Sequence, residues 1–289
     1  MSKIIVITGP TGVGKTKMSI ELAKKYNAEI INADSIQIYK ELDIGSAKIK
    51  EEEKEGIKHH LFDIKEVTDD YSVYDYQKDC RRKIEQINKK DKNIIIVGGT
   101  GLYIKAALYN YKFSLEDKKD QKTYEEYSND EIYDLLIKRY PGTTIHKNNR
   151  KRMIRELNRK EKTEKTDEIL YDAVFIGLTT DRKNLYNIID NRVDKMMKDG
   201  LLEETTSLYN RNIRSKAVMT GIGYKELYKY LDKEISLKDA IDLIKRNSRR
   251  YAKRQYTWFN HQMNITWFNV DYSNFDNTIE SVINYIGNI

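Results

Sequence analysis

Cysteine, proline and long hydrophobic runs are all scarce in this 289-residue chain. Its single cysteine, Cys80, excludes an internal disulfide framework and a cysteine-rich zinc site. With only 2 prolines, 39% hydrophobic and 34% charged residues, the composition also excludes a collagen-like or wholly disordered protein. The first apolar run, Ile4–Ile7, is too short for a signal peptide or a membrane span, and no later run is long enough. We therefore expect a soluble, cytoplasmic protein without a membrane partner.

A glycine-rich segment, Gly9–Thr16 (GPTGVGKT), directly follows the apolar segment Lys3–Thr8. It fits the P-loop pattern G-x-x-x-x-G-K-[ST], and residues at helical spacing come next, as that motif requires. Such a loop binds a di- or triphosphate through backbone N–H groups and the N-terminus of the helix. We expect Lys15 to neutralise the distal phosphate and Thr16 to bind Mg²⁺. The predicted diphosphate-binding residues are Gly9, Thr11, Gly12, Val13, Gly14, Lys15 and Thr16.

Short apolar segments typical of buried strands alternate with helical segments along most of the chain. Glu29–Ile31 and Ile94–Val97 are two such predicted strands. Residues 111–172 are densely charged, and we predict helices there and no strand. The sequence thus predicts an α/β fold, a three-layer P-loop core with a parallel sheet, interrupted by a helical insertion domain. The core is expected at residues 1–110 and 173–289.

Two polar residues, Asp34 and Thr100, come shortly after these two predicted strands. Because parallel strands build sites at their carboxyl ends, both residues should converge on the P-loop. A P-loop NTPase usually ends a second strand in an acidic residue that helps to hold Mg²⁺, yet Ile94–Val97 runs into two glycines. The set therefore suits a diphosphate held as a leaving group as well as one held as a phosphoryl donor. Asp34 as a turn cap and Thr100 as a simple turn hydroxyl are the alternatives.

The net charge of +7 is distributed unevenly. Lys138–Lys165 carries a net charge of +8 and Lys245–Arg254 one of +6, whereas the rest of the chain is acidic overall. Such a concentration is typical of a surface that binds a polyanion. Arg246, Arg250 and Arg254 are spaced to share one helical face. The aromatic residues nearby, which either stack on bases or pack in the core, are Tyr251, Tyr256 and Trp258.

Seven short motifs occur here in the order found in tRNA dimethylallyltransferases, and the resemblance covers nearly the whole chain. The motifs are Gly9–Thr16 (GPTGVGKT), Asp34–Tyr39 (DSIQIY), Asp43–Lys48 (DIGSAK), His59–Asp63 (HHLFD), Gly98–Tyr103 (GGTGLY), Gly221–Glu226 (GIGYKE) and Lys253–Trp258 (KRQYTW). The resemblance implies transfer of a dimethylallyl group from its diphosphate to the N6 amine of the adenine just 3′ of a tRNA anticodon. It also implies Mg²⁺ as cofactor and an insertion that embraces the anticodon stem-loop. We further expect a monomer.

Individual site residues follow from the same resemblance. Asp34 resembles the general base, Thr100 its active-site companion, and Arg192 an arginine directed at the diphosphate. A base is needed because the adenine amine, whose lone pair is delocalised into the ring, is a poor nucleophile. The residues implied for tRNA binding are Asp34, Ser35, Ile36, Gln37, Lys151, Arg152, Met153, Ile154, Arg155, Lys253, Arg254, Gln255 and Trp258.

Three other functions compete with this interpretation. The first is a small-molecule kinase, which the lack of a clear strand-terminal carboxylate for Mg²⁺ disfavours. The second is a prenyl transferase that acts on free adenine nucleotides, although a mononucleotide needs no extended basic surface. The third is a non-catalytic P-loop module that binds RNA, which the placement of Asp34 and Thr100 makes less attractive.

Overall fold

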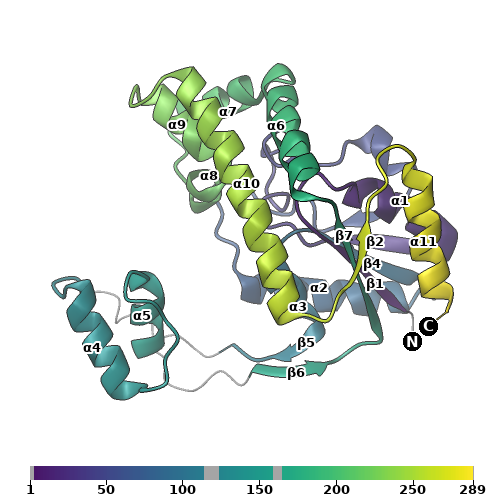
Figure 1. Cartoon of the computed structure of the whole chain (residues 1–289), viewed down its shortest axis with the longest axis horizontal. Coiled ribbons are helices and arrows are strands. Elements are labelled where there is room, and N and C mark those ends of the chain that lie inside the picture. The colour runs from purple at the N-terminus through teal and green to yellow at the C-terminus, as the bar shows by residue number, and fades with distance from the viewer. Residues whose placement is uncertain (1–2, 114–123, 159–164, 289) are drawn as a thin grey trace. The chain divides into compact units, whose positions relative to one another are not determined.

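The computed structural model of the chain describes residues 3–113, 124–158 and 165–288 (Figure 1). It consists of two compact units. The larger unit comprises Met1–Tyr109 and Ile169–Ile289, and the smaller comprises Asn110–Glu168. Each is described by itself below.

A six-stranded sheet forms the centre of the larger unit, in the order β3-β2-β4-β1-β7-β8. All its strand pairs are parallel. This arrangement confirms the predicted α/β fold with a parallel sheet. The strands are β1 (Ile4–Thr8), β2 (Ala28–Asn32), β3 (His59–His60), β4 (Asn93–Val97), β7 (Ala173–Thr179) and β8 (Thr266–Asn269).

Helices cover both faces of this sheet, which gives three layers (Figure 1). Successive side chains of β1 point to opposite faces, so Ile5 and Ile7 pack with α1 and α11, whereas Ile4 and Val6 pack with α2, α3 and α10. The helices of this unit are α1 (Lys15–Tyr26), α2 (Val73–Asn88), α3 (Gly101–Leu108), α6 (Arg182–Lys198), α7 (Leu201–Asn210), α8 (Lys216–Thr220), α9 (Tyr224–Leu231), α10 (Leu237–Gln262) and α11 (Phe275–Gly287), with a short 3₁₀ helix at Glu51–Lys54.

Helix α10 is 26 residues long and amphipathic. It begins after Ser236, whose hydroxyl accepts a hydrogen bond of 3.1 Å from the backbone N–H of Asp239. Its buried side chains include Ile244 and Phe259, while Arg250 on its outer side is exposed. Neither α10 nor any other helix among the described residues has the length and apolar character needed to cross a membrane.

The smaller unit has a hydrophobic core of its own. Helices α4 (Asn129–Arg139) and α5 (Arg150–Leu157) supply most of the side chains of this core. Strands β5 (Tyr109–Tyr111) and β6 (Lys165–Ile169) form a separate two-stranded sheet. The prediction that this region lacks strands is therefore wrong: β6 (KTDEI) contains a single apolar residue, so no hydrophobic alternation marked it. Residues 114–123 and 159–164 of the predicted insertion lie outside the described part.

Candidate active site

The loop between β1 and α1 has the backbone geometry of a phosphate-binding loop. Gly9, Gly12 and Gly14 all have positive φ angles, of 137°, 90° and 87°. These conformations favour glycine, and a methyl group on Gly9 would also lie only 2.3 Å from the carbonyl oxygen of Leu178. Val13 is fully buried in the hydrophobic core. The loop is thus fixed to the body of the protein.

A cavity of about 530 Å³ opens beside this loop. It lies at the carboxyl ends of β1, β2 and β4, where a parallel sheet places its ligands. Helices α6 and α10 supply the opposite walls. The predicted site residues that line it are Thr11, Gly12, Gly14, Lys15, Thr16, Asp34, Ser35, Ile36, Gln37, Arg192, Arg254 and Gln255. Gly9, Val13, Thr100, Lys253 and Trp258 lie outside this lining.

Two of the cations that line the cavity, Lys15 and Arg192, interact electrostatically with the carboxylate of Asp34. The ammonium of Lys15 donates hydrogen bonds to the carbonyl oxygens of Gly9 (3.0 Å) and Pro10 (2.7 Å). Burial, followed by the charge of Arg192, lowers the pKa of Lys15 to about 7, and Asp34 opposes this shift. Burial likewise lowers the pKa of Arg192, again against the effect of Asp34. An anionic ligand would offset the cost of holding both cations away from water.

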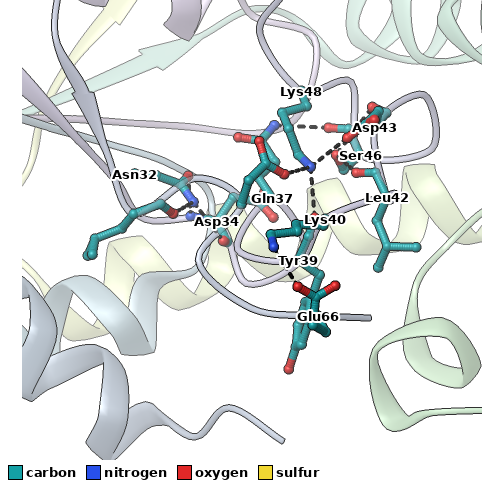
Figure 2. Close-up of polar contacts among 12 residues, drawn as sticks. Asn32, Asp34, Gln37, Tyr39, Lys40, Leu42, Asp43, Ser46, Lys48 and Glu66 are labelled. Atoms are coloured by element: carbon teal, nitrogen blue, oxygen red, sulfur yellow. Dashed lines mark hydrogen bonds and ion pairs between the residues drawn. The ribbon is translucent and has the colours of Figure 1, made fainter. Parts of the chain in front are cut away.

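Asp34 is half-buried and faces this cavity from the turn after β2. The side chain of Asn32 fixes the turn: it accepts from the N–H of Asp34 (2.9 Å) and donates to the carbonyl oxygens of Asp34 (3.1 Å) and Leu61 (3.0 Å) (Figure 2). One carboxylate oxygen of Asp34 accepts a hydrogen bond of 2.9 Å from the N–H of Ile36. The turn-cap interpretation therefore holds for this oxygen, and the same contact aims the carboxylate at the cavity.

Thr100 lies behind this turn. Its hydroxyl accepts a hydrogen bond of 3.1 Å from the N–H of Ser35, so it connects the ends of β2 and β4. Tyr251 of α10, for which the sequence allowed either base stacking or packing in the core, lines the cavity next to it. Burial and the charge of Asp34 raise the pKa of Tyr251 to about 12, while Thr100 and Gln255 oppose the shift. The four-residue spacing of Tyr251 and Gln255 was the available signal for this shared helical face.

Gln255 fastens α10 to the glycines after β4. Its amide donates a hydrogen bond of 3.0 Å to the carbonyl oxygen of Gly99, and a methyl group on Gly99 would lie 2.1 Å from the same amide. Trp258 packs equally closely on Gly101, where an added methyl would come within 2.2 Å of the indole ring. For Trp258 the core interpretation therefore fits better than an exposed base-stacking surface. Tyr256 is 41% exposed.

The two basic segments are only partly available to a ligand. On α10, Lys245 pairs with Asp194 at 2.7 Å and Arg249 pairs with Asp190 of α6. Within the segment Lys245–Arg254, the exposed basic residues without an ion pair in the described structure are Arg246, Arg250, Lys253 and Arg254.

On α5, by contrast, Lys151, Arg152 and Arg155 are exposed. Met153 is fully buried in the core of the smaller unit, and Ile154 is half-buried. The prediction that this segment binds tRNA accordingly depends on its three basic side chains.

The family model for IPP transferases matches residues 37–262. The chain belongs to the IPP transferase family. The resemblance found from the motifs is thereby confirmed.

Among relatives in this family, the tRNA dimethylallyltransferase of Anoxybacillus flavithermus is 47% identical and aligns over 98% of this chain and 96% of that protein. That of Bacillus subtilis is 47% identical over 92% of this chain and 90% of its own length.

Solved structures agree with these sequence relationships. The tRNA isopentenylpyrophosphate transferase of Bacillus halodurans matches with a TM-score of 0.78 and 41% identity, covering 100% of this chain and 96% of that one. A eukaryotic dimethylallyltransferase described as acting on tRNA matches with a TM-score of 0.86 and 31% identity, covering 100% of this chain and 79% of that one. Both likenesses extend over the P-loop and Asp34, which precede the residues matched by the family model.

Binding of inorganic diphosphate should depend on the charge of Lys15. With a pKa of about 7, Lys15 loses its proton as the pH rises, so affinity should fall by up to about tenfold between pH 7.5 and 8.5. Lys15→Arg stays protonated and serves as the control, because it reports only the titration of the ligand. Titration calorimetry at several pH values measures both proteins, and identical pH profiles would contradict the assignment.

Replacing Gly98 should destabilise the turn that carries Asp34. A methyl group at this position would lie 2.3 Å from the carbonyl carbon and oxygen of Ala33. We expect Gly98→Ala to lower the free energy of unfolding by about 1–3 kcal/mol in urea denaturation, the usual cost of overpacking. Gly287→Ala is the matched control, since its methyl meets nothing within 4 Å. Equal stabilities of the two variants would refute the steric argument.

Proposed function

We propose that this IPP transferase transfers a dimethylallyl group from dimethylallyl diphosphate to the N6 amine of the adenine immediately 3′ of the anticodon of tRNA, releasing diphosphate. One observation carries the proposal: the cavity holds the P-loop, the cations Lys15 and Arg192, and the carboxylate of Asp34 together. The P-loop at the end of β1 can thus bind a leaving diphosphate, and Asp34 at the end of β2, on the other side of β4, can serve as a base for the acceptor. The relatives named as tRNA dimethylallyltransferases support the choice of substrates.

The diphosphate would bind at the P-loop as a leaving group. As the C–O bond breaks, its electron pair and growing negative charge stay on the diphosphate oxygen. Lys15 and Arg192 would stabilise that charge, and they act strongly because both are desolvated. The cavity walls would also keep water from the reactive allylic carbon.

Thr16 is the residue that we propose as the ligand of Mg²⁺. It lines the cavity as the second residue of α1. Within residues 3–113, 124–158 and 165–288, no group of three or more His, Cys, Asp or Glu side chains could hold a metal. The donor set therefore fits an ion held by one protein hydroxyl, by diphosphate oxygens and by water, a coordination that Mg²⁺ accepts. When bound, the ion would supply further neutralisation of the leaving group.

Asp34 would act as the general base. The N6 nitrogen forms the new N–C bond, and its proton moves to the carboxylate as the bond forms. Since the hydrogen bond from Ile36 occupies only one oxygen in the described structure, the second can face the amine. Thr100 would support the reaction by fixing Ser35, the residue after the base.

The exposed basic residues of α10 would bind the tRNA backbone. Arg254 connects the two functions, because it is exposed and also lines the cavity. The target adenine must leave its stack to enter, which costs a few kcal/mol at most for a single-stranded loop. Phosphate contacts would offset this cost.

The competing functions fit less well. A kinase would need an acidic Mg²⁺ ligand at a strand end, where β4 is followed by Gly98 and Gly99. A transferase for free nucleotides would have no use for the exposed cations of α10. Nucleoside analysis of bulk tRNA after incubation with the protein, Mg²⁺ and dimethylallyl diphosphate tests the proposal directly. The absence of N6-dimethylallyladenosine would refute it.

Asp34→Asn should abolish most of the turnover. The amide oxygen can still accept the hydrogen bond from Ile36, but the side chain can no longer take the proton. We expect the rate of single-turnover transfer to fall by about 10²–10⁴-fold. Affinity for an anticodon stem-loop, measured by filter binding, should change by less than about threefold. Turnover close to that of the wild type would rule Asp34 out as the base.

The salt dependence of RNA binding should identify the exposed cations of α10. Arg246→Gln combined with Arg250→Gln should reduce the slope of log K against log salt concentration by about 1–2. Lys24→Gln combined with Lys25→Gln is the charge-matched control, since α1 covers the opposite face of the sheet. If both double variants change the slope equally, the effect is one of net charge and α10 is no specific RNA surface.

A further inference from the structure

A glutamate outside the cavity binds the backbone of one of the cavity walls. Within the described structure, Glu204 of α7 is not one of the residues that line the cavity. Its carboxylate nevertheless accepts three backbone hydrogen bonds from a single loop. The donors are the N–H groups of Asp43 (3.1 Å), Ile44 (2.8 Å) and Gly45 (3.1 Å). The hydroxyl of Tyr224 donates a fourth bond of 2.7 Å to the same carboxylate.

The loop packs closely against α9 on the side that faces Glu204, so its backbone has little room to move there. Tyr224 is fully buried, and a methyl group on Gly45 would lie 2.6 Å from its ring. A carboxylate is suited to this position because it only accepts hydrogen bonds and meets four donors. An amide would turn one N–H group of its own toward those donors.

The other side of the loop faces the cavity. Gly45, Ser46 and Ala47 line it, and Ala47 has a positive φ of 46°. The carbonyl oxygen of Ser46 accepts a hydrogen bond of 3.0 Å from the side-chain amide of Gln37 (Figure 2). The carbonyl oxygen of Ala47 accepts one of 3.3 Å from the same amide. The loop therefore supports the segment Asp34–Gln37, which carries the base.

Lys48 closes the loop at its far end. Its side chain is only 6% exposed, and its ammonium donates to the carbonyl oxygen of Tyr39 (2.7 Å) and to the carboxylate of Asp43 (2.6 Å) (Figure 2). The hydroxyl of Ser46 donates a bond of 2.6 Å to the carbonyl oxygen of Leu42. These contacts fold the loop on itself, and Glu204 attaches it to α7.

We propose that Glu204 is a positioning residue for the RNA acceptor: through loop 43–47 and Gln37 it holds the segment Asp34–Gln37 in its place at the cavity. The inference rests on the proposed function of that segment. The P-loop is anchored independently, by its own glycines and by Val13, so Glu204 should influence the RNA side of the reaction far more than the diphosphate side.

Glu204→Gln tests this inference, with Glu203→Gln as the matched control. Both residues lie in the first turn of α7, so both changes remove the same favourable charge from the helix N-terminus. Glu203 is exposed and has no hydrogen bond or ion pair within the described structure. Only Glu204→Gln removes the acceptor for the loop.

We expect Glu204→Gln to lower kcat/KM for an anticodon stem-loop by at least tenfold, and Kd for dimethylallyl diphosphate to stay within twofold. Amide hydrogen exchange in residues 42–48 should accelerate, while that of the P-loop stays unchanged. Tyr224→Phe, which removes one of the four donors, should act in the same direction but less strongly. Glu203→Gln should match the wild type in all three measurements.

The inference would be overturned if Glu204→Gln lowered kcat/KM for the stem-loop and the affinity for dimethylallyl diphosphate by the same factor. A fall in kcat/KM that the unfolded fraction in a thermal melt accounts for would also overturn it. So would unchanged kinetics or unchanged exchange in Glu204→Gln. A wild-type protein that transfers no dimethylallyl group would instead refute the proposed function. The exchange data then still show whether Glu204 holds the loop.

Discussion

The enclosure of Lys15 and Arg192 in one cavity is the constraint on which the site depends. Each cation loses hydration there, and their mutual repulsion is opposed mainly by Asp34. An anion would offset the cost of holding both cations there, so the charges of the site suit the proposed diphosphate ligand. The same carboxylate is the proposed base, so the group that lessens the repulsion between the cations also receives the proton. Binding and chemistry therefore share one small set of charges.

The carboxylate is held by a layered set of contacts. Asn32 fixes the turn that precedes the base, and Thr100 fixes the backbone of Ser35 from the neighbouring strand end. Farther out, loop 43–47 supports Gln37 and is itself attached to Glu204. Since a displacement of about 1 Å can cost a large factor in rate, these contacts bear directly on the proposed role of Asp34.

Much of this protein followed from local patterns in the sequence. Continuous apolar runs such as Ile94–Val97 predicted buried parallel strands because both faces of such strands are covered. The P-loop was recognisable because its function needs particular glycines at fixed spacing. Strand β6 escaped prediction because hydrogen bonding to β5 defines it, while its sequence contains a single apolar residue. Tyr251 escaped because its closeness to Asp34 and Thr100 arises only from packing between distant segments.

By itself, the sequence determined the phosphate-binding loop, the buried strands around Glu29–Ile31 and Ile94–Val97 and the presence of a carboxylate after β2, since each depends on neighbours in the chain. Only the tertiary structure decided which basic residues remain available. Lys245 and Arg249 lie in the same basic segment as Arg246 and Arg250. Carboxylates of α6 nevertheless pair with Lys245 and Arg249 and leave Arg246 and Arg250 without such a pair. It also decided that Glu204, distant in sequence, holds a wall of the cavity. Such pairings depend on how far-apart segments meet in space, which local pattern does not encode.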